Sequence, residues 1–179
     1  GESWYFPETI PVAQFYQINV DEEMPYNIYG GMQDNGNWYG PGYVWRRGGI
    51  RTLYWQYLVG GDGFYISPDA EDERFGYGTS QNGNLYRYDK IGGYYSSIKP
   101  PRPEGFPRLR FHRNAAFAQD PHDPKTVYYG SQFVHKSNDK GKSWEVISPD
   151  LTTNKPEQQK RDYGGLTLDA SGAEFYNTI

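Results

Sequence analysis

One short motif near the end of the chain constrains the fold more than any other stretch. Residues 137–144 read SNDKGKSW, and Asn138, Asp139 and Gly141 supply the backbone conformations that a tight hairpin turn needs. Trp144 then opens an alternating run typical of a strand. We expect Asp139 to accept backbone N–H hydrogen bonds within its own turn, and Trp144 to pack between neighbouring sheets. The structural residues of this motif are Ser137, Asp139, Gly141 and Trp144.

The chain contains an internal repeat. Residues 1–4 read GESW and residues 141–144 read GKSW, at an offset of 140 residues. Three Tyr-Gly pairs, each with a glutamine two to three residues further on, are spaced by 48 and 52 residues. These pairs are Tyr29-Gly30, Tyr77-Gly78 and Tyr129-Gly130, and each follows an acidic turn. The repeating unit is therefore about 47 residues long.

A unit of about 40–50 residues with four short strands is typical of a β-propeller blade. The composition agrees, because 18% aromatic residues, 22 glycines and 13 prolines favour an aromatic core and many turns. We predict an all-β fold with innermost strands at residues 15–20, 63–66 and 115–118. The predicted divisions are a preceding blade's last strand (1–9), three blades (10–58, 59–105 and 106–152), and a loop with the start of a further blade (153–179).

Three blades and two partial blades form an incomplete ring, because propellers close with about four to eight blades. We expect either a longer polypeptide or other chains to supply the remaining blades. The open ends would expose apolar sheet faces, which predicts low stability for this segment by itself.

Several classes of function are disfavoured. A net charge of −4 gives no basic surface for nucleic acid. The absence of cysteine removes thiolate metal sites, and His112, His122 and His135 have no metal-ligand spacing. No glycine-rich phosphate loop and no apolar run of about 20 residues is present. We therefore expect no cofactor, no metal and no membrane span in this segment.

Asp62 is the strongest candidate for a ligand-binding residue. Glycines flank it at 60, 61 and 63, which permits close approach of a ligand, and it enters an innermost strand at the rim of the predicted central channel. Gln33 and Asp34 lie on the loop between the second and third strands of the preceding blade. The alternative is that Asp62 bonds to the backbone of its own turn.

Five polar residues enter the third blade at the same rim position: Arg108, Arg110, His112, Arg113 and Asn114. Strand alternation would send Arg110 and His112 to one face and Arg113 to the other. Together with Asp62 they could bind a carboxylate or sugar hydroxyls. The alternative is a buried structural salt bridge, for instance between Arg110 and Asp62.

Residues 137–144 resemble an Asp-box, the bacterial neuraminidase repeat. The wider chain is similar to bacterial Asp-box propellers of the sortilin-like and xyloglucanase-like group, through residues 30–36 (GGMQDNG), 60–64 (GGDGF) and 148–154 (SPDLTTN). The resemblance implies an extracytoplasmic protein, in the periplasm, at the cell surface or secreted. It also implies Asp62 as an acid or base if the protein is an enzyme, with Asp34 as a second carboxylate. The Asp-box is specific for the fold but not for the function.

Two functions follow as expectations. The first is a non-enzymatic propeller module that binds or scaffolds a protein partner. The second is a glycoside hydrolase that acts on a polysaccharide, with Asp62 as acid or base. A glycosidase needs two carboxyl groups about 5–10 Å apart, one with a raised pKa, and only Asp62 is well placed. The many aromatic residues between 39 and 57 suit either blade contacts or a binding surface, so binding is favoured.

Overall fold

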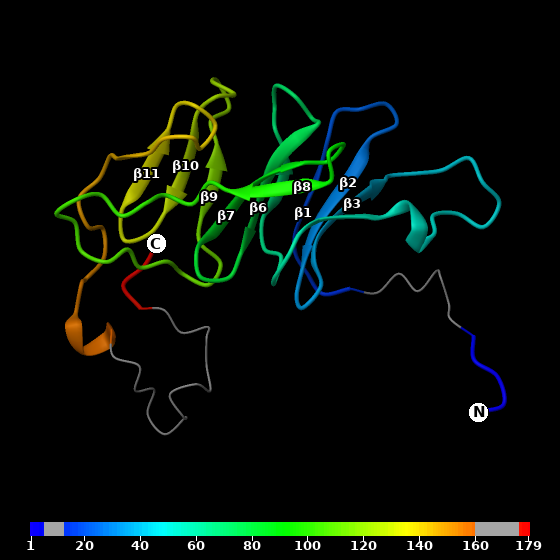
Figure 1. The fold of residues 1–179 in the computed structure, drawn as a ribbon, viewed down its shortest axis with the longest axis horizontal. Helices are drawn as coiled ribbons and strands as arrows, with labels where there is room; N and C mark the ends of the chain where they lie inside the picture. Colours follow the sequence, from blue (N-terminus) through cyan, green and yellow to red (C-terminus); the bar gives the residue numbers. More distant parts are fainter. Residues whose placement is uncertain (6–12, 160–175) are drawn as a thin grey trace.

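The computed structural model describes residues 1–5, 13–159 and 176–179. Twelve strands form three four-stranded antiparallel sheets, and the described residues contain no α-helix. The sheets follow one another along the chain and lie side by side (Figure 1). The predicted all-β fold with three four-stranded units is confirmed.

Each sheet is a meander of four consecutive strands. The first contains β1 (Phe15–Val20), β2 (Asn27–Met32), β3 (Gly36–Pro41) and β4 (Gln56–Val59). The second contains β5 (Ile66–Pro68), β6 (Phe75–Ser80), β7 (Asn84–Asp89) and β8 (Tyr94–Ser97). The third contains β9 (Phe117–Gln119), β10 (Val127–Gly130), β11 (Val134–Ser137) and β12 (Glu145–Val146). Two short 3-10 helices, Thr52–Tyr54 and Pro156–Gln159, lie outside the sheets.

The innermost strands differ from the sequence-based prediction in where they begin. β1 matches residues 15–20, whereas β5 and β9 start at Ile66 and Phe117 instead of residues 63 and 115. In the second sheet the Tyr65 N–H donates to the Thr79 hydroxyl (2.9 Å) rather than to a backbone carbonyl, so the regular ladder begins one residue later. The predicted terminal partial blades fall largely on residues 6–12 and 160–175, outside the described residues.

Backbone hydrogen bonds fix how the three sheets correspond. The N–H of Asp21, Asp69 and Asp120 donates to the carbonyl of Asn27, Phe75 and Thr126 respectively, at 3.2, 3.0 and 3.0 Å. The true spacing is therefore 48 and then 51 residues, and Tyr128 corresponds to Tyr29 and Tyr77. The alignment on Tyr129-Gly130 was wrong by one residue, because two adjacent tyrosines precede the glycine. Gln33, Gln81 and Gln132 have the correct spacing.

Aromatic and aliphatic side chains fill the spaces between the sheets. Tyr29, Leu58, Val59, Ile66 and Tyr88 form one cluster between the first and second sheets. Leu85, Phe111, Ala115 and Tyr129 form another between the second and third sheets, and Trp144 packs against it. The Trp144 indole N–H also donates to the carbonyl of Ile98, which directly follows β8 of the second sheet (2.8 Å). Its expected position between sheets is confirmed.

The Asp139 turn is held by its own side chains. The Asp139 carboxylate accepts the Ser143 backbone N–H (2.8 Å), the Ser143 hydroxyl (2.6 Å) and the Ser137 hydroxyl (2.8 Å). The hydrogen bonds from Ser143 lower the pKa of Asp139 to about 2. This is the bonding expected for a structural turn.

Among the described residues, no helix is both long and apolar enough to cross a membrane.

Candidate functional site

An open polar hollow of about 430 Å³ lies between the turn that follows β2 and the segment that leads into β5. Its lining consists of Asp34, Asn35, Gly36, Tyr57, Gly61, Asp62 and Gln81. Two polar turns from neighbouring sheets therefore form one site, and Asp62 lies at the junction between them.

Glycines bring these two turns together. A side chain at Gly63 would meet the Gly36 carbonyl oxygen at 2.2 Å, and one at Gly31 would meet the Phe64 carbonyl oxygen at 2.4 Å. Gly61 has a φ of +89°, a conformation that L residues with side chains rarely adopt. The glycines around Asp62 therefore allow the second sheet to approach the first, which fixes where Asp62 lies.

Asp62 binds to groups outside its own turn. Its Oδ1 accepts the Asp34 backbone N–H (2.9 Å) and the Gln33 Nε2 (3.0 Å), and its Oδ2 accepts the Arg113 guanidinium. Burial raises the pKa of Asp62, but the Asp34 N–H and the Arg113 charge outweigh burial and lower it overall. Asp62 is therefore held as a carboxylate that joins the first sheet to the third.

The repeated glutamines hold the segments that enter the sheets. The Gln81 side-chain carbonyl accepts the Asp62 N–H (2.9 Å), and the Gln132 side-chain carbonyl accepts the Arg110 N–H (2.8 Å). Asp62 and Arg110 thus occupy equivalent entry positions in successive sheets. In both cases the side chain of the repeated glutamine accepts a backbone N–H from the segment that leads into its own sheet.

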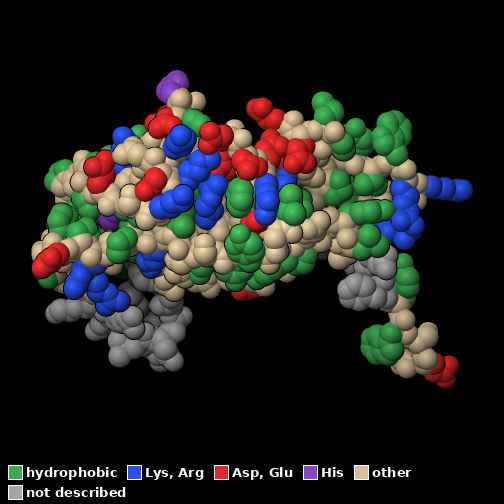
Figure 2. Space-filling model, turned by 45° about the horizontal axis from the view of Figure 1, so that its top comes forward, with side chains coloured by type: hydrophobic (Ala, Val, Ile, Leu, Met, Phe, Trp, Pro, Cys, Tyr) green, Lys and Arg blue, Asp and Glu red, His purple; other side chains and the backbone are tan. Residues whose placement is uncertain are grey.

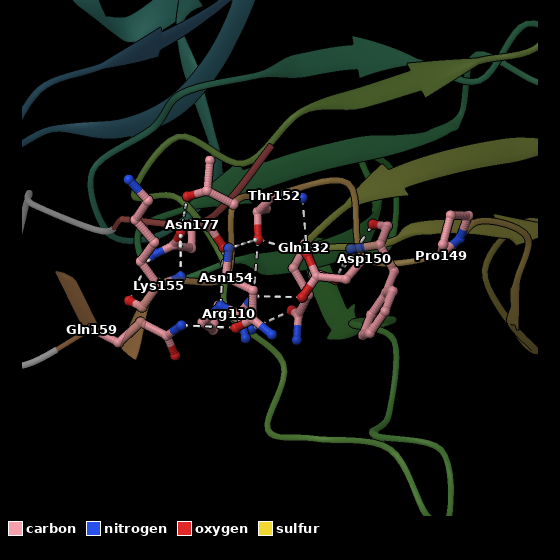
Figure 3. A network of polar contacts seen from close by, with 12 residues as sticks. Arg110, Gln132, Pro149, Asp150, Thr152, Asn154, Lys155, Gln159 and Asn177 are labelled. Carbon is pink, nitrogen blue, oxygen red and sulfur yellow. Dashed lines mark hydrogen bonds and ion pairs between the residues drawn. The ribbon is translucent and has the colours of Figure 1, made fainter. Parts of the chain in front are cut away.

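Arg110 does not pair with Asp62, so the pair given as an instance of a structural salt bridge is wrong, but each of the two residues forms an ion pair with another partner. The Arg110 guanidinium donates to Asp150 (2.9 Å), to Thr152 (3.2 Å) and to the Asn177 carbonyl (3.0 Å), in a separate network (Figure 3). Arg113 is the partner of Asp62 instead. Strand alternation does not predict the side-chain directions here, because this segment is not a strand and turns at residues 113–114.

His112 and Asn114 are exposed, and a local hydrogen bond joins them: the Asn114 N–H donates to His112 Nδ1 (3.1 Å). This bond does not connect them to the Asp62 network. Of the predicted ligand-binding residues, the structure brings Gln33, Asp34 and Asp62 together.

Arg113 and Tyr16 complete the rim of the site. Arg113 belongs to the predicted rim group of the third blade, whereas Tyr16 was not predicted. The Tyr16 hydroxyl donates to Gln33, and the Tyr16 ring lies 4.6 Å from the Phe64 ring, between centroids. The Arg113 guanidinium lies 5.8 Å from the centroid of Phe64. Three sheets therefore contribute side chains to one rim. In the sequence, the only sign of this rim was that these residues occupy corresponding positions in successive repeats.

The hollow is lined by two carboxylates, two side-chain amides and one aromatic ring. Asp34 and Asn35 are exposed at its edge, and Tyr57 is 52% exposed. Gln33 Nε2 donates to both Asp34 (2.8 Å) and Asp62 (3.0 Å), which places the two carboxylates on either side of one amide. Such a site is suited to a positively charged or hydrogen-bond-donating ligand.

Comparison with known proteins finds a likeness to solved structures only. No family model matches the chain, and no curated protein matches it. A similar solved structure is the GH74 xyloglucanase from Xanthomonas campestris, with 16% sequence identity and a TM-score of 0.48. The match covers 70% of this chain but 19% of that protein, so the chain spans a small part of its length.

Proposed function

We propose that the chain is a non-catalytic binding module of the Asp-box β-propeller kind, and that it contacts a protein partner at the hollow beside Asp62. One observation carries this proposal. Both oxygens of the Asp62 carboxylate accept hydrogen bonds, from Asp34, Gln33 and Arg113, and Asp62 organises an open rim on which other polar groups remain exposed.

The alternative function, a glycoside hydrolase, would require different chemical properties of the same residues. Its general acid needs a raised pKa so that it is protonated near neutral pH. The pKa of Asp62 is lowered instead, because the hydrogen bonds from Asp34 and Arg113 outweigh the effect of burial. The lowered pKa bears on the acid role alone, because a general base has to be ionised. Against the base role stands the engagement of both Asp62 oxygens by Asp34, Gln33 and Arg113.

The exposed groups suggest what the partner presents. Tyr57 offers an amphipathic ring of the kind enriched at protein interfaces, and Asp34 offers a carboxylate on the edge of the hollow. An extended peptide with a lysine or arginine side chain would place its charge beside Asp34 and its backbone N–H groups toward acceptors on the rim. The extracytoplasmic location and the wider propeller are proposals supported by the Asp-box resemblance of residues 137–144.

The test is a binding measurement with two classes of probe. Immobilised short peptides of varied charge and xyloglucan oligosaccharides are presented to the chain. We expect binding to lysine- or arginine-containing peptides that falls at least about tenfold in Tyr57→Ala or Asp34→Asn, which corresponds to about 1.4 kcal/mol. Tyr94→Ala is the matched control, because Tyr94 is 60% exposed on β8 and does not line the hollow. Binding to oligosaccharides alone, or peptide binding that these variants leave unchanged, would refute the proposal.

A further inference from the structure

The opposite end of the sheets carries a repeated charged contact. Asp21, Asp69 and Asp120 each follow directly after an innermost strand, and acidic and basic side chains are interleaved along this end (Figure 2). The hollow lies at the other end of the sheets, so these charged contacts do not depend on the proposed binding at the hollow, although they bear on the proposed wider propeller.

The first instance joins the first and second sheets. Lys90 lies in the turn between β7 and β8, and its Nζ reaches back to Glu23 (2.7 Å), the Tyr29 hydroxyl (3.2 Å) and Asp21 (3.7 Å). The Asp21 side chain is fully buried and that of Lys90 is 8% exposed. The Tyr29 hydroxyl also donates to Asp21 (2.9 Å), which completes the contact.

The second instance joins the second and third sheets in the same way. Lys140 lies in the turn between β11 and β12, and its Nζ reaches Asp69 (2.9 Å) and Glu71 (2.8 Å). The two lysines are equivalent, since each follows an aspartate in its turn and donates its N–H to a carbonyl just before the second strand of its sheet, at 2.9 Å. In the second and third sheets, a turn lysine therefore binds the acidic turn of the sheet before it.

The third sheet has the acceptor half of this contact. The Tyr128 hydroxyl donates to Asp120 (3.0 Å), as Tyr29 does to Asp21. Within residues 1–5, 13–159 and 176–179, no lysine or arginine forms an ion pair with Asp120, which is half-buried. The outward surface of the sheet beside it is open: Ala116 and Ala118 are exposed, and Ile147 is 49% exposed.

A backbone hydrogen bond at the other end of this surface marks the position at which the chain would lead into a further sheet. The Ile179 N–H donates to the Ser131 carbonyl (2.8 Å), and the Gly63 N–H donates to the Met32 carbonyl (2.9 Å). Ser131 and Met32 are equivalent in the repeat, and Gly63 belongs to the segment that leads into the second sheet. Ile179 therefore occupies the entry position of a following sheet.

We propose that the outward surface of the third sheet binds a fourth four-stranded sheet, which follows Ile179 in the polypeptide and presents a turn lysine to Asp120 and Tyr128. The contact would repeat the two that the chain already contains. A second copy of this chain fits less well, because Gly42 of the first sheet stands where the other sheets have Lys90 and Lys140. The Gly42 N–H makes the equivalent hydrogen bond to Tyr26 (2.9 Å), and the Tyr26 ring covers it.

The acidic group that meets Lys90 does not suggest a metal site. Oxygens of Asp21, Glu23 and Glu73 lie within 4.8 Å of one another, but the Lys90 ammonium is bound to two of these residues. The ammonium supplies the positive charge that a cation would otherwise provide.

Carbodiimide crosslinking of the protein from its natural source, read by mass spectrometry, tests the proposal. The zero-length reagent joins a carboxylate to a lysine already in contact with it. Glu23–Lys90 and Glu71–Lys140 crosslinks are the internal positive controls. We expect Asp120 to be crosslinked to a lysine that lies beyond Ile179 in the same polypeptide and directly follows an aspartate.

Matched variants make the result specific. Asp120→Asn should remove this crosslink, whereas Asp123→Asn, three residues along the same turn, should leave it in place. Three results would overturn the proposal: a crosslink from Asp120 to another polypeptide or to a second copy, one to a lysine outside an Asp-Lys turn, or free labelling of Asp120 by a soluble amine with no crosslink.

Discussion

Lys140→Met should destabilise the chain by about 2 kcal/mol. Lys140 is 17% exposed and donates to both oxygens of the fully buried Asp69, at 3.0 and 2.9 Å. Breaking a buried ion pair typically costs about 3–5 kcal/mol. The loss is smaller here because Arg87 still pairs with Asp69 (2.7 Å) and methionine retains most of the apolar stem.

The assay is urea unfolding followed by circular dichroism. With a slope of about 2 kcal/mol per molar urea, the midpoint should fall by about 1 M. Lys142→Met is the matched control, since Lys142 lies two residues further along the same turn and is exposed. A Lys140→Met midpoint that differs from the control by less than about 0.2 M would refute the proposed energetic role of the contact.

The pH dependence gives a second check on the same pair. Burial raises the pKa of Asp69, but the Glu71 N–H, Lys140 and Arg87 lower it overall. A lowered folded-state pKa means that the contribution is present above the unfolded value of 3.8 and is lost as pH falls below it. The difference between wild type and Lys140→Met should therefore be full at neutral pH and shrink in acid.

Three further predictions concern the rest of the structure. Asp62→Asn should cost about 2 kcal/mol in urea unfolding, because Asn breaks the charge pair with Arg113; no measurable loss would show that the network does not stabilise the fold. Trp144→Ala should lower the free energy of unfolding by about 3 kcal/mol, and Trp144→Phe should lower it less, because Phe loses mainly the hydrogen bond to Ile98. Equal losses in the two variants would show that the packing of the ring contributes nothing beyond the hydrogen bond. Burial lowers the pKa of His135 to about 4, so the neutral ring stabilises the fold above about pH 6.5, and this contribution is lost as pH falls toward 4; His135→Gln should flatten that part of the stability profile.

The sequence predicted local features well. Residues 15–20 form β1 as expected, and Asp139 accepts hydrogen bonds from its own turn, because alternation and turn chemistry act over neighbouring residues. The four-stranded repeat followed from spacing alone. The alignment on the Tyr-Gly pairs misplaced the third repeat by one residue, whereas the glutamines have the correct spacing. Hydrogen bonds from Gln81 and Gln132 to the segments that enter their sheets fix this position.

Contacts between sheets were harder to predict. Arg113, not Arg110, reaches Asp62, and the choice depends on a turn at residues 113–114 in an irregular segment. Lys90 and Lys140 form ion pairs with the preceding sheet. The strand pattern does not specify which side chains meet between two sheets. The shared Asp-Lys order, Asp89-Lys90 and Asp139-Lys140, was the signal in the sequence that could have identified them.

Sugar release from a soluble β-glucan, assayed across acidic and neutral pH, tests most directly the claim that Asp62 organises a binding rim and transfers no proton. The account predicts no reducing-sugar release by the chain or by Asp62→Asn. Release by the unmodified chain that disappears in a folded Asp62→Asn variant would contradict it and favour the glycoside hydrolase.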